Sequence, residues 1–469
     1  MGVKYRLFGV GLKGKSPVVS SQHRINCYLE RIVDEDTEQT SLLASPGMDL
    51  MGNLGDTPIR GWIVVGEFIY AVHRNTFYEI NNGGIATSRG TISTSTGRVD
   101  MASDGDVVLI VDGTEGNTYT VSSTTLAPIA DSDFPDAART CSWGGGYFKV
   151  ETGDQWMLSE DGTTWDALDI ATAEHAPDGI VRVVDDHSET LVLGDYTTEF
   201  WGLTGNQDFP YVPIRGSAVE YGLAAKFSLA KFENSVAGLF KNRLGQVQVM
   251  MIEGHTMVPI STPELDSTIN RYSNPITATG YSYMHEGHSF YRINFPSDGK
   301  SWEYDGTASK QFGFPVWCER QSGVDGERHR GEMCINYLNK VRIADFENGK
   351  FYTLNATTYS ENGTYYPLEL TSRRVVKDFD SFSINKLYLD FETGVGLATG
   401  QGSDPQVMLS ISRDGGRTFG QEMWKDLGAV GKYLTRVEWH QIGTADTFVF
   451  RVRITDPVKR HLVNAGLIE

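Results

Sequence analysis

The sequence of 469 residues predicts an all-β fold, a β-propeller of seven or six blades followed by a C-terminal β-sandwich-like domain. Three observations predict this architecture. A short strand-rich unit recurs along most of the chain, helical periodicity is nearly absent, and the C-terminal part changes to longer alternating strands.

The recurring unit is a polar turn, an apolar strand, a second turn and an aromatic-rich strand. Its first copy reads VVGEFIYAVHRNTFYEI from Val64, and successive apolar strands begin 39, 40, 44, 45, 54 and 51 residues apart. A strand-only period of roughly 40 to 50 residues is typical of a propeller blade. One unit cannot bury both faces of its sheet, so the units must pack around a common axis. The strands begin at Phe68, Val107, Tyr147, Leu191, Val236, Phe290 and Val341. One unit could belong to a flanking domain, which leaves six blades as the alternative.

Helix signals are sparse in a chain with 51 glycines. The best candidate has Thr262 as N-cap and Pro263 at the first helical position, and it runs towards Asn270. We therefore expect one short helix and otherwise strands and turns.

Three regions are expected along the chain. Residues 1–57 precede the first unit and predict an extended arm that closes the ring or contacts a neighbour. Residues 58–375 form the propeller. Residues 376–469 form the second β-domain, because apolar and polar residues alternate there with the period of two that half-buried antiparallel strands show.

Charge and cysteine content narrow the function. The net charge of −19 and the pI near 5.0 argue against a protein that grips nucleic acid through its phosphates, although DNA could slide past such a surface. Solubility alone is the other explanation for the acidity.

The four cysteines have no metal-ligand spacing and are interpreted as buried thiols of a reducing compartment: Cys27, Cys141, Cys318 and Cys334. No signal core and no apolar run of 18 residues is present, so no membrane span is expected.

The string from Gly9 to Ser16 matches the phosphate-binding pattern GxxxxGK[ST] letter for letter. That chemistry needs a helix beginning at Lys15, whose backbone N–H groups face the phosphates. Pro17 follows directly and disfavours a helical conformation of Ser16. We interpret the string as a basic strand-turn.

Two segments resemble the Asp-box, S-x-D-G-x-T-W/F, of sialidase-like propellers. Its Asp accepts backbone N–H bonds across a turn, its Gly adopts a positive φ and its aromatic residue packs beneath. We expect structural hairpins here rather than catalytic, cofactor-binding or metal-binding residues. The residues are Ser159, Asp161, Gly162, Thr164 and Trp165 in the first, and Ser412, Asp414, Gly415, Gly416, Thr418 and Phe419 in the second.

An enzyme is not predicted. Sialidase-like catalysis would need an arginine cluster, a nucleophile and an acid, and only Tyr291 to Asn294 echoes the arginine motif weakly. His285 and His288 lie in a turn and are interpreted as exposed imidazoles rather than metal ligands.

The order of several short strings resembles a family of phage proteins, the packaged-DNA stabilisation or tail hub (nozzle) proteins of short-tailed phages. Near the start these are RINCYLE from Arg24, SPG from Ser45 and PIRG from Pro58. In the middle they are LG at Leu193 and TEFW from Thr198. The C-terminal strings are the most specific: DGGRTFG from Asp414, Trp424, LG at Leu427, RVEW from Arg436 and FRVRITDP from Phe450.

This resemblance implies a structural virion protein without catalytic residues or cofactors. It would form a homo-oligomeric ring of six copies in the virion tail, assembled in the host cytoplasm. Its partners would be the portal-adaptor protein, the tail needle and the tailspikes. DNA would pass through its channel during ejection without tight binding, and the protein would stabilise the packaged genome. The alternative is a glycan-binding or sialidase-like propeller acting at the host surface.

Overall fold

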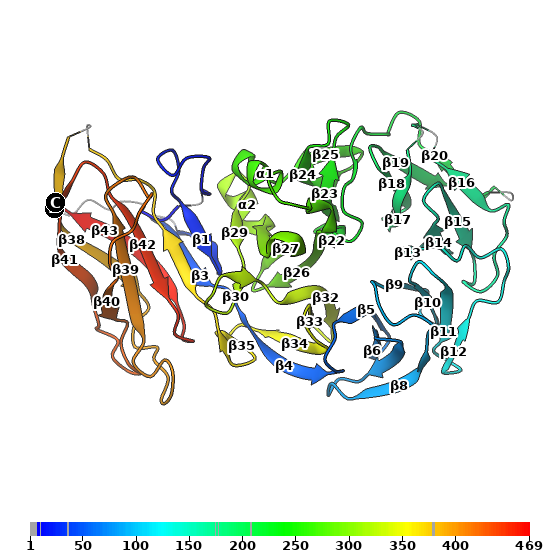
Figure 1. Cartoon of the computed structure of the whole chain (residues 1–469), viewed down its shortest axis with the longest axis horizontal. Coiled ribbons are helices and arrows are strands. Elements are labelled where there is room, and N and C mark those ends of the chain that lie inside the picture. Colours follow the sequence, from blue (N-terminus) through cyan, green and yellow to red (C-terminus); the bar gives the residue numbers. More distant parts are fainter. Residues whose placement is uncertain are drawn as a thin grey trace.

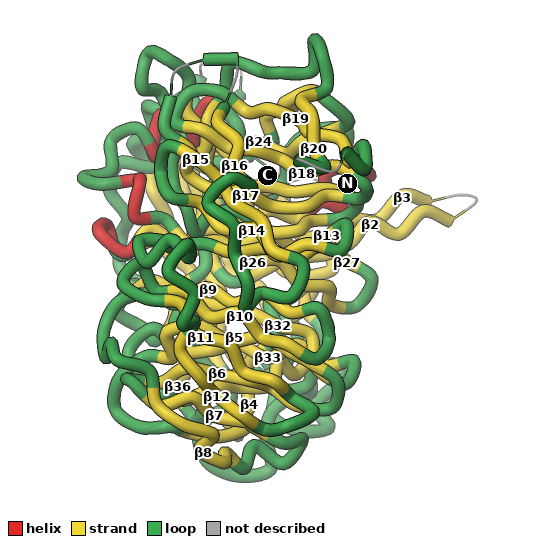
Figure 2. The backbone as a smooth tube through the Cα atoms, turned by 90° about the vertical axis from the view of Figure 1, so that its right-hand side faces the viewer, coloured by secondary structure: helices red, strands yellow, loops and turns green. Residues whose placement is uncertain are grey.

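The chain folds into a ring of β-sheets with a two-sheet sandwich beside it (Figure 1). The computed structural model describes residues 7–9, 11–34, 37–173, 175–176, 178–206, 209–377 and 380–469. Strands dominate the backbone throughout (Figure 2), which confirms the all-β prediction, and both predicted parts, propeller and sandwich, are present.

Seven blades form the ring within these described ranges, each an antiparallel sheet. Blade 1 is β5 (Ile59–Val65), β6 (Phe68–His73), β7 (Thr76–Ile80) and β8 (Ala86–Thr91); blade 2 is β9 (Asp100–Ser103), β10 (Val107–Val111), β11 (Gly116–Thr120) and β12 (Thr125–Pro128). Blade 3 is β13 (Cys141–Gly144), β14 (Tyr147–Glu151), β15 (Gln155–Ser159) and β16 (Ile170–Thr172); blade 4 is β17 (Ile180–Asp186), β18 (Glu189–Gly194), β19 (Thr198–Leu203) and β20 (Tyr211–Pro213). Blade 5 is β21 (Gly222–Leu223), β22 (Ala230–Phe232), β23 (Ser235–Lys241), β24 (Val247–Glu253) and β25 (Thr256–Pro259); blade 6 is β26 (Thr279–His285), β27 (His288–Phe295), β28 (Lys300–Asp305) and β29 (Trp317–Glu319). Blade 7 contains β32 (Gly331–Tyr337), β33 (Lys340–Asp345) and β34 (Lys350–Asn355).

Neighbouring blades share their apolar faces, as the repeat argument requires. Between blades 1 and 2, for example, Tyr70 and Val72 of β6 pack with Val108 and Ile110 of β10 and with Tyr119, and all five side chains are buried. Comparable clusters fill the other blade interfaces. Burial of this apolar surface is the main force that holds separate sheets in one ring.

Blade 7 is completed by a strand from the other end of the chain. β4 (Gly47–Asn53) pairs antiparallel with β34, with Met48 opposite Leu354. Met48 is buried against Ile343 and Tyr352. A β-carbon at Gly47 would lie 2.4 Å from the Thr358 carbonyl oxygen, so only glycine fits there. An early segment therefore closes the ring. Two short strands extend this sheet: β35 (Ser360–Glu361) and β36 (Thr364–Tyr365).

The sandwich combines strands from both ends of the chain. One sheet contains β1 (His23–Ile25), β37 (Leu368–Thr371), β42 (Val449–Ile454), β39 (Gln406–Ser412) and β40 (Met423–Asp426). The other contains β2 (Cys27–Asp34), β3 (Thr37–Ala44), β43 (His461–Ile468), β38 (Phe382–Phe391) and β41 (Val437–Ala445). β1 also pairs in parallel with β29, Ile25 opposite Glu319, so the first sheet continues into blade 6. The β2–β3 hairpin projects from the molecule (Figure 2).

Strand pairing divides the chain differently from the expected ranges. Residues 23–44 pair within the sandwich and residues 47–53 within the propeller, while β37 pairs with sandwich strands before residue 376. Pairing over such sequence distances leaves no local pattern, so the ranges 1–57, 58–375 and 376–469 remain predictions.

The expected helix is confirmed as α1 (Pro263–Ile269). The Thr262 hydroxyl accepts a 3.3 Å hydrogen bond from the Leu265 N–H, and Asn270 is the C-cap. A second helix, α2 (Gly306–Phe312), was not expected. Asp305 caps its N-terminus and Gly313 ends it in the left-handed conformation. The remaining short elements are η1 (Pro275–Thr277), η2 (Pro296–Asp298), β30 (Gln321–Ser322) and β31 (Glu327–Arg328).

Candidate functional site

The first Asp-box-like segment forms a closed turn between β15 and β16 of blade 3. The Asp161 carboxylate accepts hydrogen bonds from the backbone N–H groups of Thr163 (2.8 Å) and Thr164 (2.7 Å). The Ser159 hydroxyl accepts from the Gly162 N–H at 3.0 Å and donates to the Thr164 carbonyl at 2.6 Å. Partial burial alone would raise the pKa of Asp161, but these backbone bonds outweigh it and lower the pKa.

Trp165 anchors this turn to the chain before blade 3. Its ring is buried against Phe134, with ring centroids 5.2 Å apart, and its indole N–H donates to the Gly162 carbonyl at 3.2 Å. Its backbone N–H donates to the Asp131 carboxylate at 2.9 Å. Gly162 has φ +72°, which a side chain would strain. The polar side-chain atoms of the motif thus all bond within the turn.

The second segment forms a similar turn in the sandwich, between β39 and β40. The Asp414 carboxylate accepts from the Ser412 hydroxyl (2.6 Å), the Thr418 hydroxyl (2.6 Å) and the backbone N–H groups of Arg417 and Thr418. These bonds, above all those from Ser412 and Thr418, hold the pKa of Asp414 well below its usual range. Gly415 and Gly416 both have positive φ. The Asp414 carboxylate therefore accepts hydrogen bonds within its own hairpin.

Phe419 differs from the expected buried anchor. It is half-buried, and the Arg451 guanidinium lies 4.4 Å from its ring centroid. The buried space beneath the two glycines is instead used by the N-terminal segment, because β-carbons added at Gly415 and Gly416 would come within 3.1 Å of Val18 and Ser21 respectively.

The residues that pack against this turn, Pro17, Val18 and Ser21, directly follow the P-loop-like string. Its described part ends in a tight turn over residues 15–19, where the Ser16 carbonyl accepts from the N–H groups of Val19 and Ser20. No helix begins at Lys15 in the described chain, so the geometry that cradles phosphate is not formed.

The arginine of the weak sialidase echo is buried in an ion-pair network beside the sandwich. Arg292 Nε donates to Glu303 Oε2 at 2.8 Å, and its Nη atoms donate to the Tyr281 and Tyr283 hydroxyls at 2.8 Å each. Burial alone would raise the pKa of Glu303, but Arg292 and Arg320 outweigh it and lower the pKa to about 2. The Arg292 side chain has no exposed surface, so it cannot grip a substrate carboxylate.

The network continues towards blade 7 and β35. His329 lies 3.2 Å from the Glu361 carboxylate, and Arg330 lies 3.3 Å from both Glu361 and Asp345. Burial and the Arg292 charge lower the pKa of His329 to about 3, so its imidazole is neutral at neutral pH. Buried charges persist only when paired, and these pairs connect blade 6, blade 7 and β35.

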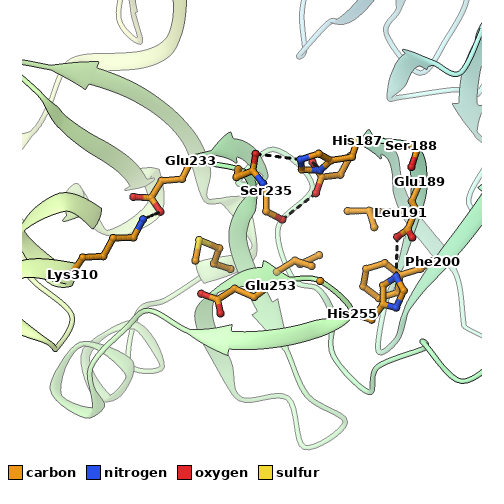
Figure 3. A pocket seen from close by; sticks show the side chains of 15 residues that line it. His187, Ser188, Glu189, Leu191, Phe200, Glu233, Ser235, Glu253, His255 and Lys310 are labelled. Carbon is orange, nitrogen blue, oxygen red and sulfur yellow. Dashed lines mark hydrogen bonds and ion pairs between the residues drawn. The ribbon is translucent and has the colours of Figure 1, made fainter.

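A pocket with a volume of about 500 Å³ lies between blades 4 and 5 (Figure 3). Its walls come from the β17–β18, β22–β23 and β24–β25 turns, which share one face of the ring. Leu191 and Phe200 lie behind the pocket and are each only 1% exposed, Met251 is half-buried, and the His255 ring lies 4.6 Å from that of Phe200. The exposed part of the pocket lining is therefore mainly polar.

Four carboxylates surround this pocket, and three of them have partners. Glu189 lies 2.9 Å from His255 Nε2, Glu233 lies 2.5 Å from Lys310 Nζ, and Asp186 accepts from the Ser235 hydroxyl at 3.1 Å. Glu253 forms no ion pair with any described residue. The pocket is therefore acidic, with one unpaired carboxylate.

The predicted exposure of both turn histidines was wrong for His288. Its imidazole is buried and bonds the Asp305 carboxylate at 2.8 Å, at the cap of the unexpected helix α2. Burial also lowers the pKa of the neighbouring His285. In the described part of the chain, no group of three or more His, Cys, Asp or Glu side chains is arranged to hold a metal. Cys27, Cys141 and Cys318 are buried free thiols, and Cys334 is half-buried.

Sequence reasoning located the two hairpins but missed the pocket and the network. The pocket residues come from turns separated by dozens of residues, so no motif unites them. One sequence feature pointed to the pocket region: the TEFW string from Thr198 contains Phe200, which lies at the pocket. No helix among the described residues is long and apolar enough to cross a membrane.

Comparisons with known proteins agree with this architecture. The family model "Bacteriophage P22 Gp10, beta-propeller" matches residues 29–359, and "Bacteriophage P22 Gp10, beta-sandwich" matches residues 368–467. The tail hub protein gp10 of Salmonella phage P22 is 24% identical over 288 residues, which is 60% of this chain and 58% of the relative. The aligned region thus spans little more than half of that relative's length.

Solved propellers are more distant. The WD40 β-propeller domain of Doa1 has a TM-score of 0.39 and 10% identity, with 66% of this chain and 97% of that chain covered. The N-terminal domain of Nup159 has a TM-score of 0.41 and 9% identity, with 71% and 98% covered. The two family models together cover the propeller and the sandwich in order, and the chain belongs to the bacteriophage P22 Gp10 family.

Proposed function

We propose that this chain is a structural tail hub protein of a short-tailed phage. The observation that carries the proposal is the match of both family models, in order, over 29–359 and 368–467. The named relative is itself a tail hub protein. The carboxylates of Asp161 and Asp414 and the guanidinium of Arg292 form hydrogen bonds within the protein. This fits a structural scaffold rather than a glycan-processing site.

In this proposal several copies, six by the family resemblance, form a ring in the virion tail, below the portal and its adaptor. The ring extends the DNA channel and supports the tail needle and the tailspikes. Assembly takes place in the host cytoplasm. The continuous sheet from blade 6 through β1 into the sandwich supports this role, because strand pairing joins the two parts.

The charge supports a channel that passes DNA without holding it. Each chain carries a net charge of −19, and a ring of copies multiplies that negative field. A wall of this sign makes few phosphate contacts, so DNA experiences little friction on it. Retention of the genome then depends on a partner that plugs the channel.

Particles assembled without this protein test the proposal. They should fill with DNA and then lose it, because the tail cannot be completed and closed. Nuclease-protected DNA per particle, measured over time after packaging, reports this directly. Stable retention of the genome in these particles would remove the tail hub assignment.

Duplex binding by the isolated chain tests the channel idea separately. Titration with duplex DNA at low and high salt should give weak binding. Tight binding that falls steeply with salt would show that the protein grips the DNA backbone.

A further inference from the structure

Two cysteines that are far apart in the sequence meet at the junction between the sandwich and blade 6. Cys27 is the first residue of β2, and Cys318 is the middle residue of β29. The parallel pairing of β1 with β29 brings the two segments together, because it places Ile25 opposite Glu319. Both cysteines belong to one hydrophobic cluster, and both are free thiols. The fold thus places two thiols in one buried site.

The two thiols are in direct contact. The sulfurs of Cys27 and Cys318 share a hydrogen bond, and the backbone N–H of Cys27 also donates to the Cys318 sulfur. Both residues border one small cavity of about 10 Å³, roughly the space of a single water molecule. Contact between two sulfurs is the arrangement from which a disulfide forms with the least movement of the backbone.

The surroundings make Cys318 the more reactive of the two. Burial alone would raise the pKa of the Cys318 thiol, but the hydrogen bond with Cys27 and the positive charge of Arg24 outweigh it and lower the pKa. The pKa of Cys27 is raised, first by burial and then by the same hydrogen bond. Because the thiolate is the nucleophile in thiol oxidation, Cys318 reacts first and Cys27 supplies the second sulfur.

The other two cysteines lie apart from this pair and from each other. Cys141 belongs to β13 of blade 3 and Cys334 to β32 of blade 7, in different hydrophobic clusters. Burial raises the pKa of Cys141 well above its ordinary value, and it raises the pKa of Cys334 to about 12. Both thiols therefore stay protonated and serve as controls within the same chain.

We propose that Cys27 and Cys318 are a redox-active pair, which a small peroxide converts into a disulfide between β2 and β29. The Cys318 thiolate attacks one oxygen of hydrogen peroxide, so that an S–O bond forms and the O–O bond breaks. The hydroxide that leaves takes up the proton lost by Cys318. The Cys27 sulfur then attacks the sulfur of the Cys318 sulfenic acid, an S–S bond forms, and the hydroxyl group leaves as water with the Cys27 proton. The two thiols lose two electrons, and the peroxide is reduced to two molecules of water.

The disulfide joins the sandwich to the propeller covalently. β2 belongs to a sandwich sheet, whereas β29 belongs to blade 6. A cross-link between segments so distant in sequence restricts the unfolded chain strongly and stabilises the folded one. In a virion protein the reaction follows release from the reducing host cytoplasm. This timing rests on the proposed function, whereas the pairing of the thiols rests on the fold alone.

Oxidation of the purified chain tests the pairing. The folded protein is treated with hydrogen peroxide, the peroxide is removed with catalase, and the remaining thiols are alkylated during unfolding. Peptides are then mapped by mass spectrometry without reduction. We expect one cross-linked peptide that joins Cys27 to Cys318, while Cys141 and Cys334 are recovered alkylated, and dithiothreitol should restore all four thiols. Cross-links between other cysteines, or Cys27 and Cys318 recovered unlinked, would overturn the inference.

The melting temperature gives an independent readout. Peroxide treatment should raise it by several degrees in the native chain and in the control variant Cys141→Ser, and dithiothreitol should reverse the rise. Cys27→Ser removes the second sulfur, so its melting temperature should not rise and Cys318 should accumulate as sulfenic or sulfinic acid. An equal rise in Cys27→Ser would contradict the pairing.

The peptide map of the native chain decides the question even if the Cys27→Ser variant does not fold, because it needs no substitution. Failure of the pairing would leave the tail hub assignment intact, since genome retention in particles tests that assignment separately. Loss of the tail hub assignment would likewise leave the thiol pair in place and remove only its timing.

Discussion

Arg292 and Glu303 face each other directly across the neighbouring strands β27 and β28, and Arg292 Nε donates a 2.8 Å hydrogen bond to Glu303 Oε2. Both side chains are buried, so water cannot replace either partner. Tyr283 adds a 2.6 Å bond to the same carboxylate oxygen. The pair lies inside blade 6, in the sheet that continues through β29 and β1 into the sandwich.

Replacement of Arg292 by Met should lower the free energy of unfolding by about 3–5 kcal/mol, because Glu303 would lose its closest counter-charge inside the protein. Chemical denaturation of the purified chain measures this. The matched control is Lys459→Met, which breaks the exposed pair with Glu392 and should cost less than about 1 kcal/mol. Equal losses in the two variants would contradict the importance of the buried pair.

Acid should destabilise the protein through the same carboxylate. The folded-state pKa of Glu303 is about 2, below its ordinary value of 4.5, so the unfolded chain binds the proton more readily. Its contribution to stability is present above about pH 4.5 and is lost as the pH falls towards 2. The pKa of Glu319, which bonds His23 and Lys300, is likewise lowered to about 2, so its contribution to stability is lost over the same pH window. Melting temperature against pH should fall less steeply for Glu303→Gln than for the native chain over this window. If melting temperature fell equally steeply with pH in the variant and in the native chain, Glu303 would not be responsible for the acid sensitivity.

Asp161→Ala should remove the carboxylate that closes the blade 3 turn and cost about 1–2 kcal/mol, as loss of its backbone hydrogen bonds predicts. Asp161→Asn keeps an acceptor and should cost less. Glu160→Ala, at the exposed neighbouring position, serves as the control and should change stability by less than about 0.5 kcal/mol. Unchanged melting of the Asp161→Ala variant would show that the turn does not depend on this residue.

Because β4 closes the ring, truncation of the buried Met48 side chain should destabilise the fold. Met48→Ala leaves a cavity against Ile343 and Tyr352 and should lower the free energy of unfolding by about 2–5 kcal/mol. Met284→Ala, where the native side chain is 68% exposed, is the control of the same chemistry. Similar stabilities of the two variants would mean that blade 7 does not need the N-terminal strand.

The sequence was most informative where structure is local. The blade unit and the α1 cap at Thr262 depend on residues within a few positions of each other, and both have the predicted form. The exposure of His288 was mispredicted because its partner Asp305 belongs to a different strand.

Contacts between distant segments could not be predicted. β1 to β3 join strands near the C-terminus, as in the pairing of Leu42 with Leu462, and this leaves no periodic pattern. The pocket likewise gathers Glu189, Glu233 and Lys310 from three separate connections. Only the folded ring brings such residues together.

Electron cryo-microscopy of intact particles of the phage that encodes this chain tests the central claim most directly. The account predicts a ring at the tail vertex in which every subunit shows a seven-bladed propeller continuous with a β-sandwich, coaxial with the DNA channel. A tail vertex without this density, or the same propeller at the tip of a host-binding fibre, would contradict the tail hub assignment.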